Sequence, residues 1–253
     1  MPLEKDGFIN AFSTRFSGVS PFPENSLNLA FIEDDTQENV IENRRRFLKA
    51  IDKEPAHLYC NKQVHSDIIN KVDCSSISSE ENLGDALFSN LKNIILGVKT
   101  ADCQSILIGD RKSGLFCSIH AGWQGTLQEI TLKAVHQLVS LGASTDDMIA
   151  ALGPSACGQC YEVGSDVKNK FESKIADNHL FIRIKSDGRY FLDVPKANML
   201  QLLKVGIKPS QIFQSGFCTI HENNLFFSHR LEGLHPTRPK GKTGRHLSII
   251  GKF

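Results

Sequence analysis

The feature of this sequence that most constrains its fold is a series of short apolar runs that alternate with amphipathic segments in no regular order. Runs of strand length with β-branched residues predict β-strands, and one pair closes a hairpin around Ser186-Asp187-Gly188. The predicted strands are His57–Cys60, Ile68–Val72, Ile94–Val98, Ser105–Ile108, Leu115–Ile119, Met148–Leu152, Leu180–Ile184, Tyr190–Leu192, a strand around Ile212, Leu225–Ser228 and Leu247–Ile250. Apolar residues at helical spacing predict helices at Thr36–Ile51, Gly125–Leu141, Ser165–Ile175 and Pro195–Val205. Because strands and helices do not alternate regularly, we expect an α+β fold with mixed β-sheets layered with helices, not a doubly wound sheet.

Length and charge narrow the class of protein further. No linker-like stretch divides the 253 residues, so we expect a single domain spanning residues 1–253. A net charge of +1 argues against broad nucleic-acid or membrane binding, since phosphate surfaces are held by clustered positive charge. The N-terminus lacks the basic and apolar stretches of a signal peptide, and no apolar run approaches the roughly 18 residues of a membrane span. These features predict a cytoplasmic protein.

The seven cysteines are odd in number and irregularly spaced, which favours reduced thiols over a disulfide framework. Cys157-Gly158-Gln159-Cys160 is the one Cys-x-x-Cys motif. It has a redox or metal-binding interpretation, and it also has a purely structural one. We favour the structural interpretation because no second pair of this kind accompanies it.

Three of the apolar runs lead into a reactive side chain. The segments are 61–67 with His65, 100–103 with Cys103, and 119–125 with His120. Strand ends and strand-to-helix turns are where a scaffold commonly presents functional groups. Two imidazoles and one thiolate suit zinc, and three protein ligands leave the fourth position open for water or substrate, as in catalytic zinc sites. Water bound to such a metal ionises with a pKa of about 7.

Two other interpretations of these residues remain open. Cys103 can be a buried core thiol beside two hydrogen-bonded histidines. It can also be a nucleophile that His65 or His120 activates. The residues lie far apart in the sequence, so their spacing does not decide between these alternatives.

Short motifs surround the three candidate ligands and continue along nearly the whole chain. Around the ligands they read Gln63-Val64-His65, Thr100-Ala101-Asp102-Cys103 and His120-Ala121-Gly122-Trp123-x-Gly125. The others are Thr14-Arg15, Asn28-Leu29, Gly84-Asp85-Ala86, Gly153-Pro154, Tyr161-Glu162-Val163-Gly164, Asp193, Phe226-Phe227-Ser228 and Thr243-Gly244-Arg245. In this order they resemble the YfiH-type family, whose members are labelled laccase-domain proteins, polyphenol oxidases, purine nucleoside phosphorylases or peptidoglycan editing factors. The resemblance implies one catalytic domain in which His65, Cys103 and His120 bind zinc.

The resemblance also implies a reaction. It predicts phosphorolysis of adenosine, inosine, guanosine and S-methyl-5'-thioadenosine, together with deamination of adenosine, with purine nucleosides and phosphate as small-molecule partners. A zinc-activated water is compatible with deamination, although the His-x-Glu and Pro-Cys-x-x-Cys motifs of zinc base deaminases are absent. We expect the predicted helix start at 122–125 to favour phosphate, and Arg15, Arg230 or Arg245 to add bidentate contacts.

Two departures from the family pattern bear on the substrate. The chain has Gln124 where the family often has Arg, and His229 where it often has Tyr, so anion binding beside the metal can differ. Three alternative functions remain. The first is editing of misbuilt peptidoglycan precursors by hydrolysis. The second is copper-dependent polyphenol oxidation, with copper as an adventitious or alternative metal, since the chain has no His-x-His pair for a copper cluster. The third is a zinc-bearing interaction protein without turnover.

Overall fold

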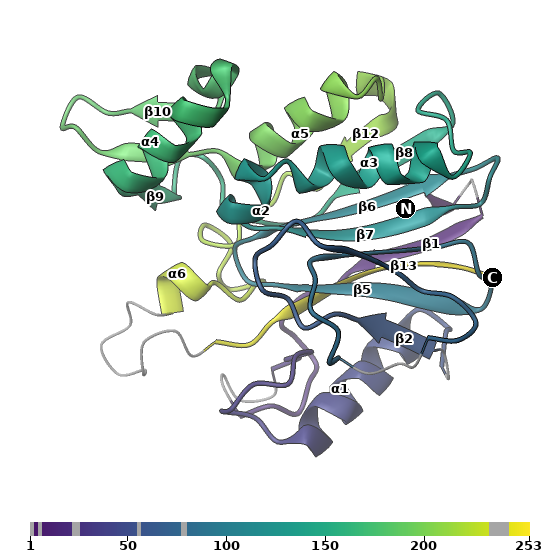
Figure 1. Ribbon diagram of the computed structural model, residues 1–253. Helices are drawn as coiled ribbons and strands as arrows, with labels where there is room; N and C mark the ends of the chain where they lie inside the picture. The colour runs from purple at the N-terminus through teal and green to yellow at the C-terminus, as the bar shows by residue number, and fades with distance from the viewer. Residues whose placement is uncertain (1–2, 5–6, 22–25, 55–56, 77–79, 233–242) are drawn as a thin grey trace.

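The computed structural model describes residues 3–4, 7–21, 26–54, 57–76, 80–232 and 243–253. Within them, two β-sheets pack face to face, and helices cover their outer faces (Figure 1). The first sheet has the order β1 (Phe8–Phe12), β13 (His246–Lys252), β5 (Ile94–Thr100), β2 (His57–Cys60). The second has the order β12 (Ile212–Gln214), β8 (Met148–Leu152), β6 (Gln104–Asp110), β7 (Phe116–Ala121), β4 (Ala86–Ser89), β3 (Ile69–Lys71). Parallel and antiparallel pairs occur in both sheets, so the predicted α+β class with mixed sheets is confirmed.

A small third sheet projects from one corner of the molecule beside helix α4 (Ser165–Lys174) (Figure 1). Its order is β10 (Ile182–Ile184), β11 (Tyr190–Leu192), β9 (Glu162–Val163). The antiparallel pair β10 and β11 confirms the predicted hairpin. The structure also contains the short helical turns η2 (Ala176–Leu180), η3 (Pro209–Gln211) and α6 (His229–Glu232).

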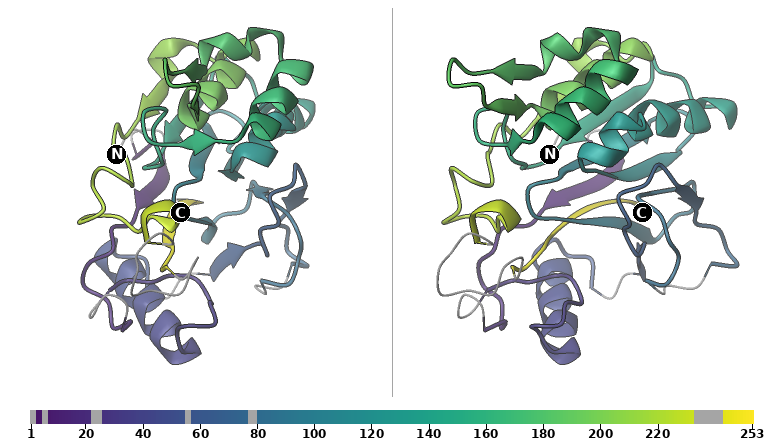
Figure 2. Two further views of the ribbon diagram at one scale, coloured as in Figure 1. Left: turned by 90° about the vertical axis from the view of Figure 1, so that its left-hand side faces the viewer. Right: turned by 60° about the vertical axis from the view of Figure 1, so that its left-hand side comes forward.

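The alternation of side chains along the central strands explains the layers. In β5, Leu96 packs into the core between the sheets, whereas Ile95 packs with residues of helix α1 (Gln37–Ala50). In β6, Leu107 joins the same inner core, whereas Ile106 packs with helix α3 (Ile130–Ser140). Strands buried on both faces need continuous apolar runs, and each buried Leu or Ile contributes about 1.5–3 kcal/mol. The views in Figure 2 keep α1 on the opposite side of the sheets from the green helices.

Two of the predicted helices begin at clear capping residues. Thr36 accepts a hydrogen bond from the Asn39 N–H at 3.2 Å and starts α1, which packs Val40 and Phe47 inward. Asp193 accepts one from the Lys196 N–H at 2.9 Å and starts α5 (Val194–Lys204), with proline in the first turn. Both helices lie within one residue of their predicted limits.

Other predictions need correction. The predicted helix at 125–141 is two helices, α2 (Trp123–Leu127) and α3, separated at Glu129, whose backbone is left-handed with a φ of 58°. Gln201 donates to the Thr126 carbonyl at 2.8 Å and supplies a donor that a continuous helix would have provided. The strand predicted at 225–228 is wrong, because Phe226 and Phe227 are both buried within a stretch of turns and loop. Strands β1, β4 and β9 have no counterpart among the predicted strands.

Across the part of the chain that the structure describes, every helix is too short or too polar to cross a lipid bilayer.

His246, at the start of β13, makes the stability of this fold sensitive to acid. Its Nε2 accepts the Phe227 N–H at 2.6 Å, and burial lowers the pKa of the ring to about 3. The unfolded chain, with the usual pKa of 6.5, therefore binds more protons, and stability falls as the pH drops from 6.5 toward 3. We expect a loss of about 2 kcal/mol between pH 7.5 and pH 5 from this residue. Urea unfolding of wild type and His246→Gln at both pH values measures this loss of stability. An equal loss in the two proteins would refute its assignment to His246.

Candidate metal centre and cleft

The three predicted ligands, far apart in the sequence, come together where the two sheets meet. Cys103 lies in the turn between β5 of the first sheet and β6 of the second, and His120 lies near the end of β7. His65 lies in the loop after β2. Their donor atoms all lie within 4.8 Å of one another, with 3.9 Å between Cys103 Sγ and His65 Nε2. This is the end of the sheets beside α2 and α6 in Figure 1.

Two residues of this site have left-handed backbone conformations that only glycine adopts freely. The φ angles are 59° at His65 and 87° at Asp102, which directly precedes Cys103. Such conformations cost roughly 1–3 kcal/mol each and persist when surrounding contacts hold them. Asp102 is held by the Thr219 hydroxyl, which donates to Oδ1 at 2.7 Å, and by the Arg230 N–H, which donates to Oδ2 at 2.6 Å. The strained turn therefore aims Cys103 at the two imidazoles.

Asp85, just before β4, fixes both histidines. Its carboxylate accepts hydrogen bonds from His120 Nδ1 at 2.8 Å, from the His65 N–H at 3.0 Å and from the Ser66 N–H at 2.7 Å. Burial opposes ionisation of Asp85, but the bonds from His120 and Ser66 outweigh it and lower the pKa to about 2. A carboxylate on Nδ1 leaves Nε2 of His120 as the atom available to a metal, which is the usual outer-shell arrangement of metal-bound histidine.

The electrostatics of the three residues favour an ionised thiol. Burial raises the pKa of Cys103, but the charge and hydrogen bond of His120 outweigh it and bring it to about 6. Burial lowers the pKa of His120, whereas the thiolate and Asp85 raise it to about 9. A thiolate and two imidazoles on a centre whose third member, His65, is exposed fit a zinc ion with one open position. A metal bound here would displace a proton from His120.

Two clefts meet at this centre. One has a volume of about 580 Å³ and includes Lys99 and Arg245 in its lining, and the other has a volume of about 210 Å³ and includes Tyr161 and Arg230. Their shared lining residues are His65, Ala101, Cys103 and His229. Both clefts therefore open onto the metal centre.

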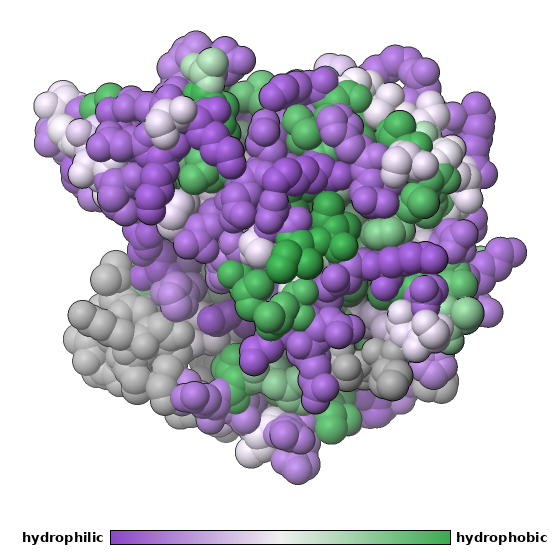
Figure 3. Space-filling view, viewed as in Figure 1, coloured by the Kyte–Doolittle hydropathy of each residue, from purple (hydrophilic) through white to green (hydrophobic). Residues whose placement is uncertain are grey.

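The surface near His65 is partly apolar. The segment that carries His65 exposes Val64 and Ile68, each with more than two-fifths of its surface accessible. On the face shown in Figure 3, apolar surface gathers near the middle and polar surface surrounds it. Exposed apolar side chains beside a cleft are compatible with a site for a small organic ligand, since such sites are lined mainly by apolar groups.

The three arginines predicted to bind substrate occupy different environments. Arg15 is buried, donates to Glu232 at 2.8 Å and to the Asn223 carbonyl at 2.7 Å, and lines neither cleft. Arg230 stacks over Tyr161 at 4.8 Å from the ring centroid, and its Nη1 donates to the Glu162 carbonyl at 2.7 Å. The structure therefore brings two of the three arginines to the metal centre, one in each cleft.

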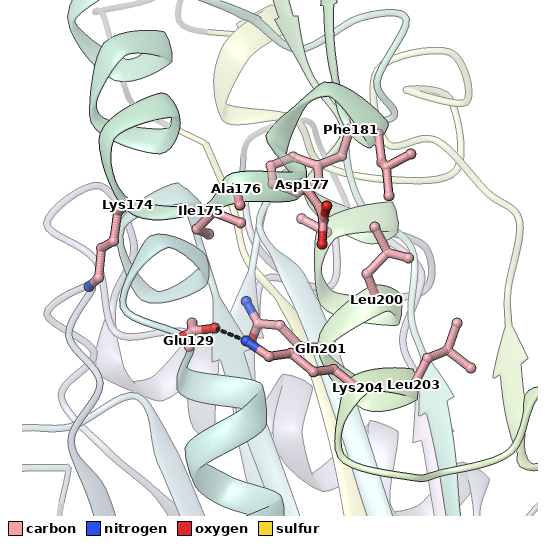
Figure 4. A pocket seen from close by; sticks show the side chains of 12 residues that line it. Glu129, Lys174, Ile175, Ala176, Asp177, Phe181, Leu200, Gln201, Leu203 and Lys204 are labelled. Atoms are coloured by element: carbon pink, nitrogen blue, oxygen red, sulfur yellow. Dashed lines mark hydrogen bonds and ion pairs between the residues drawn. The ribbon is translucent and has the colours of Figure 1, made fainter.

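A separate cavity of about 530 Å³ lies between the end of α4, η2 and α5. Figure 4 shows Lys204 reaching Glu129 across it, with Asp177 and Leu200 on the wall. The Glu129–Lys204 ion pair measures 3.2 Å. Its lining contains no cysteine or histidine, so the cavity offers no soft metal ligand.

The sequence interpretation assigned no role to Asp85 or Tyr161, which the structure places at the site. Asp85 stands in a Gly-Asp-Ala motif directly before a buried strand, and Tyr161 directly follows Cys160. Their position within family-like motifs was the available signal, but neither residue type alone indicates a metal or a cleft.

Gly122 leaves room for His65 and Cys103 to approach one another. A Cβ at this position would lie 2.9 Å from His65 Cδ2 and 3.1 Å from Cys103 Sγ. We expect Gly122→Ala to weaken zinc binding by roughly 10- to 100-fold, because ligand positions are disturbed. Gly164→Ala is the matched control. Both glycines cap a helix with φ near −74°, but a Cβ at Gly164 meets mainly the flexible carboxylate of Asp166. Titration against a chromophoric chelator measures the affinities, and equal affinities would contradict the expectation.

The fold and site define an α+β protein with a Cys/His metal-ligand set at the junction of two sheets, and its relatives share this fold. Residues 9–252 match the family described as multi-copper polyphenol oxidoreductase laccase. A protein of Deinococcus radiodurans named purine nucleoside phosphorylase is 35% identical over 242 residues, which covers 96% of this chain and 88% of that protein. Purine nucleoside phosphorylase YlmD of Bacillus subtilis is 32% identical, covering 96% of this chain and 88% of that protein.

Solved structures agree with these sequence relatives. The crystal structure of YlmD from Geobacillus stearothermophilus superposes with a TM-score of 0.87 at 32% identity, covering 97% of this chain and 92% of that chain. The Bacillus licheniformis hypothetical protein YfiH gives a TM-score of 0.90 at 29% identity, covering 99% and 94%. The chain therefore belongs to the multi-copper polyphenol oxidoreductase laccase family, and the predicted YfiH-type resemblance is confirmed.

Proposed function

We propose that this protein is a zinc-dependent purine nucleoside phosphorylase that also deaminates adenosine. The observation that carries the proposal is the convergence of His65, Cys103 and His120 between two clefts that each contain an arginine. The names of the relatives, which are purine nucleoside phosphorylases of similar length, supply the substrate class.

In this proposal the metal is held by the three residues, and the surrounding groups position them. Bound zinc would supply a Lewis acid and lower the pKa of a coordinated group. Asp85 keeps Nδ1 of His120 protonated and Nε2 directed at the centre. Cys103 is half-buried and His120 is buried, whereas the exposed His65 lies on the open side of the centre.

Phosphate is the nucleophile of phosphorolysis: its oxygen forms a bond to C1' of the ribose while the bond from C1' to N9 of the purine breaks. The electron pair goes to the base, which takes up a proton. Arg230 and Arg245 each use Nη1 for a backbone carbonyl, and a guanidinium has five donors, so further donors remain for phosphate oxygens. In this proposal Arg15, which is buried and held by Glu232, supports the fold behind the clefts.

Tyr161 and His229 are the groups that would meet the nucleoside in the smaller cleft. Burial and the Cys103 thiolate raise the pKa of Tyr161 to about 12, so its phenol stays protonated at neutral pH and can donate a hydrogen bond. The ring also lies under Arg230, which holds it in place.

The two arginines allow the phosphate to be located. We expect Arg230→Gln or Arg245→Gln to raise the KM for phosphate by about 10- to 100-fold, the effect of losing a hydrogen bond from a charged group. The larger increase identifies the cleft that holds phosphate. Arg189→Gln, on the exposed hairpin, is the control and should leave it unchanged. Steady-state kinetics at saturating nucleoside measures the KM for phosphate. An unchanged KM in both cleft variants would show that neither arginine binds phosphate.

The family description also names multi-copper oxidation. Among the described residues, the cleft assembles a single set of three donors, and no histidine-rich cluster accompanies it. We therefore retain copper as an alternative occupant of that one centre, and hydrolytic editing of peptidoglycan precursors as the alternative reaction.

Chromatography of nucleosides incubated with zinc-loaded protein tests the proposed function. Adenosine, inosine, guanosine and S-methyl-5'-thioadenosine should each yield free base only when phosphate is present, and adenosine should yield inosine with or without phosphate. If no nucleoside changes while zinc is bound, the proposal fails, and phenols with copper and peptidoglycan precursors become the substrates to test.

A further inference from the structure

A second group of metal-binding side chains lies outside the centre described above. Cys157, Cys160, Cys218 and His221 come from two loops, and their four donor atoms all lie within 4.8 Å of one another. All three cysteines have free thiols. The sequence interpretation considered Cys157 and Cys160 without their two partners, because the second loop follows almost sixty residues later.

The two loops have the same design. In each loop two residues separate the ligands, as Cys157-x-x-Cys160 and as Cys218-x-x-His221. In the first, the Cys160 N–H donates to the Cys157 carbonyl at 3.0 Å and closes a tight turn. In the second, the Glu222 N–H donates to the Cys218 carbonyl at 2.9 Å. Paired x₂ spacings of this kind are typical of structural zinc sites.

Contacts between the loops bring the four groups into one cluster. Cys160 Sγ lies 3.0 Å from His221 Nε2, and the Cys157 N–H donates to Cys218 Sγ at 3.4 Å. Ser155 and Cys218 form a parallel β-bridge that joins the loops at their base. Donors on a tetrahedral zinc with bonds of about 2.3 Å are roughly 3.8 Å apart, so small shifts of the donor atoms are enough to place them around an ion.

We propose that these four residues form a second, closed zinc site with a structural role. Three thiolates and one imidazole satisfy all four positions of tetrahedral zinc and leave none for substrate. The site thus differs from the open three-donor centre, and its occupancy does not depend on the reaction proposed for that centre.

The contacts of the two loops indicate what the second zinc stabilises. From the first loop, the Ala156 N–H donates to the Asp102 carbonyl at 2.9 Å, and from the second, the Thr219 hydroxyl donates to the Asp102 carboxylate at 2.7 Å. Asp102 has the left-handed backbone that aims Cys103 at the open centre. Tyr161, next to Cys160, lines the smaller cleft. Closure of the Cys₃His site therefore holds the strained turn beside the cleft.

Metal analysis of purified protein tests the proposal. Wild type should hold two zinc ions per chain, Cys103→Ser should retain one, and Cys160→Ser should retain one. Cys74→Ser, which changes an exposed cysteine outside both groups, should retain two. Retention of both ions by Cys160→Ser, or a single ion in wild type that only Cys103→Ser removes, would overturn the proposal.

A spectroscopic measurement covers the case in which Cys160→Ser does not fold. In wild type loaded with cobalt(II), the two sites together should bind four thiolates, one in the open centre and three in the second site. Because the thiolate-to-cobalt charge-transfer band grows with the number of bound thiolates, it should be about four times as intense as the band of a single bound thiolate. His221 is exposed, so His221→Ala alone should fold and lower the affinity of the second site without changing the first. A native mass two hydrogens below the reduced mass, with no second metal, would instead show a disulfide and refute the zinc site.

Discussion

Replacement of Cys103 by serine should lower phosphorolysis on the order of 10³-fold, because a catalytic metal contributes several kcal/mol to transition-state stabilisation. The thiol is the only sulfur donor of the open centre, and its pKa of about 6 makes it a thiolate at neutral pH. A serine hydroxyl is a much weaker ligand, so zinc should leave this centre. The rate and the zinc content of the same sample should fall together.

Cys74→Ser is the matched control for this substitution. Cys74 is exposed and belongs to neither metal-ligand group, so its replacement should change neither rate nor metal content. A Cys103→Ser protein that loses zinc but keeps its full rate would separate the metal from the reaction. Such a result would refute the proposed mechanism.

Replacement of Asp85 by asparagine should weaken zinc binding by roughly 10- to 100-fold, the usual effect of removing a partner of a metal-bound histidine. Asparagine has one acceptor oxygen, whereas the carboxylate accepts from His120 and from the His65 and Ser66 N–H groups. We also expect a loss of stability of about 3 kcal/mol, since a buried charged pair loses one partner. Zinc titration and urea unfolding measure the two effects.

Asp110→Asn is the control that separates stability from metal binding. Asp110 is buried at the opposite end of β6, and it accepts hydrogen bonds from the N–H groups of Ser113 and Ser144, each at 2.7 Å. Its replacement should lower stability and leave zinc affinity unchanged. Equal zinc affinities in Asp85→Asn and Asp110→Asn would show that Asp85 does not position the ligands.

The pKa of Asp85 also predicts an acid effect. Because its folded value, about 2, is below the ordinary 3.8, its contribution to stability is present above pH 3.8 and disappears as the pH falls toward 2. The effect of His246 sets in at higher pH, below about 6.5. Loss of structure between pH 6.5 and 4 should therefore depend on His246 and not on Asp85.

Local patterns in the sequence were sufficient to predict the central strands and the long helices. The runs at 94–98 and 105–108 are apolar on both faces because they lie between a sheet and a helix layer. Strand β4 is only four residues long, and nothing in its local pattern distinguishes it from a loop. The break at Glu129 depends on Gln201, a distant side chain that no periodicity reveals.

In the candidate site, too, some residues could be predicted from the sequence and others could not. His65, Cys103 and His120 could be proposed from their chemistry and from family-like motifs. Asp85 could not, because its role arises only when the His65 loop folds against it. Arg15 was expected at the substrate, whereas its partner Glu232 lies more than two hundred residues away in the sequence. Long-range pairs of this kind determine whether a charged residue faces a cleft or the core.

The most direct test of the central claim is the yield of ribose 1-phosphate from adenosine and phosphate, measured for wild type and Cys103→Ser at matched protein concentration. Our interpretation predicts that wild type releases ribose 1-phosphate in an amount equal to adenine and hypoxanthine together, because adenosine that is first deaminated yields hypoxanthine, and that the variant releases almost none. Free ribose in place of ribose 1-phosphate, or an equal yield from Cys103→Ser, would contradict it.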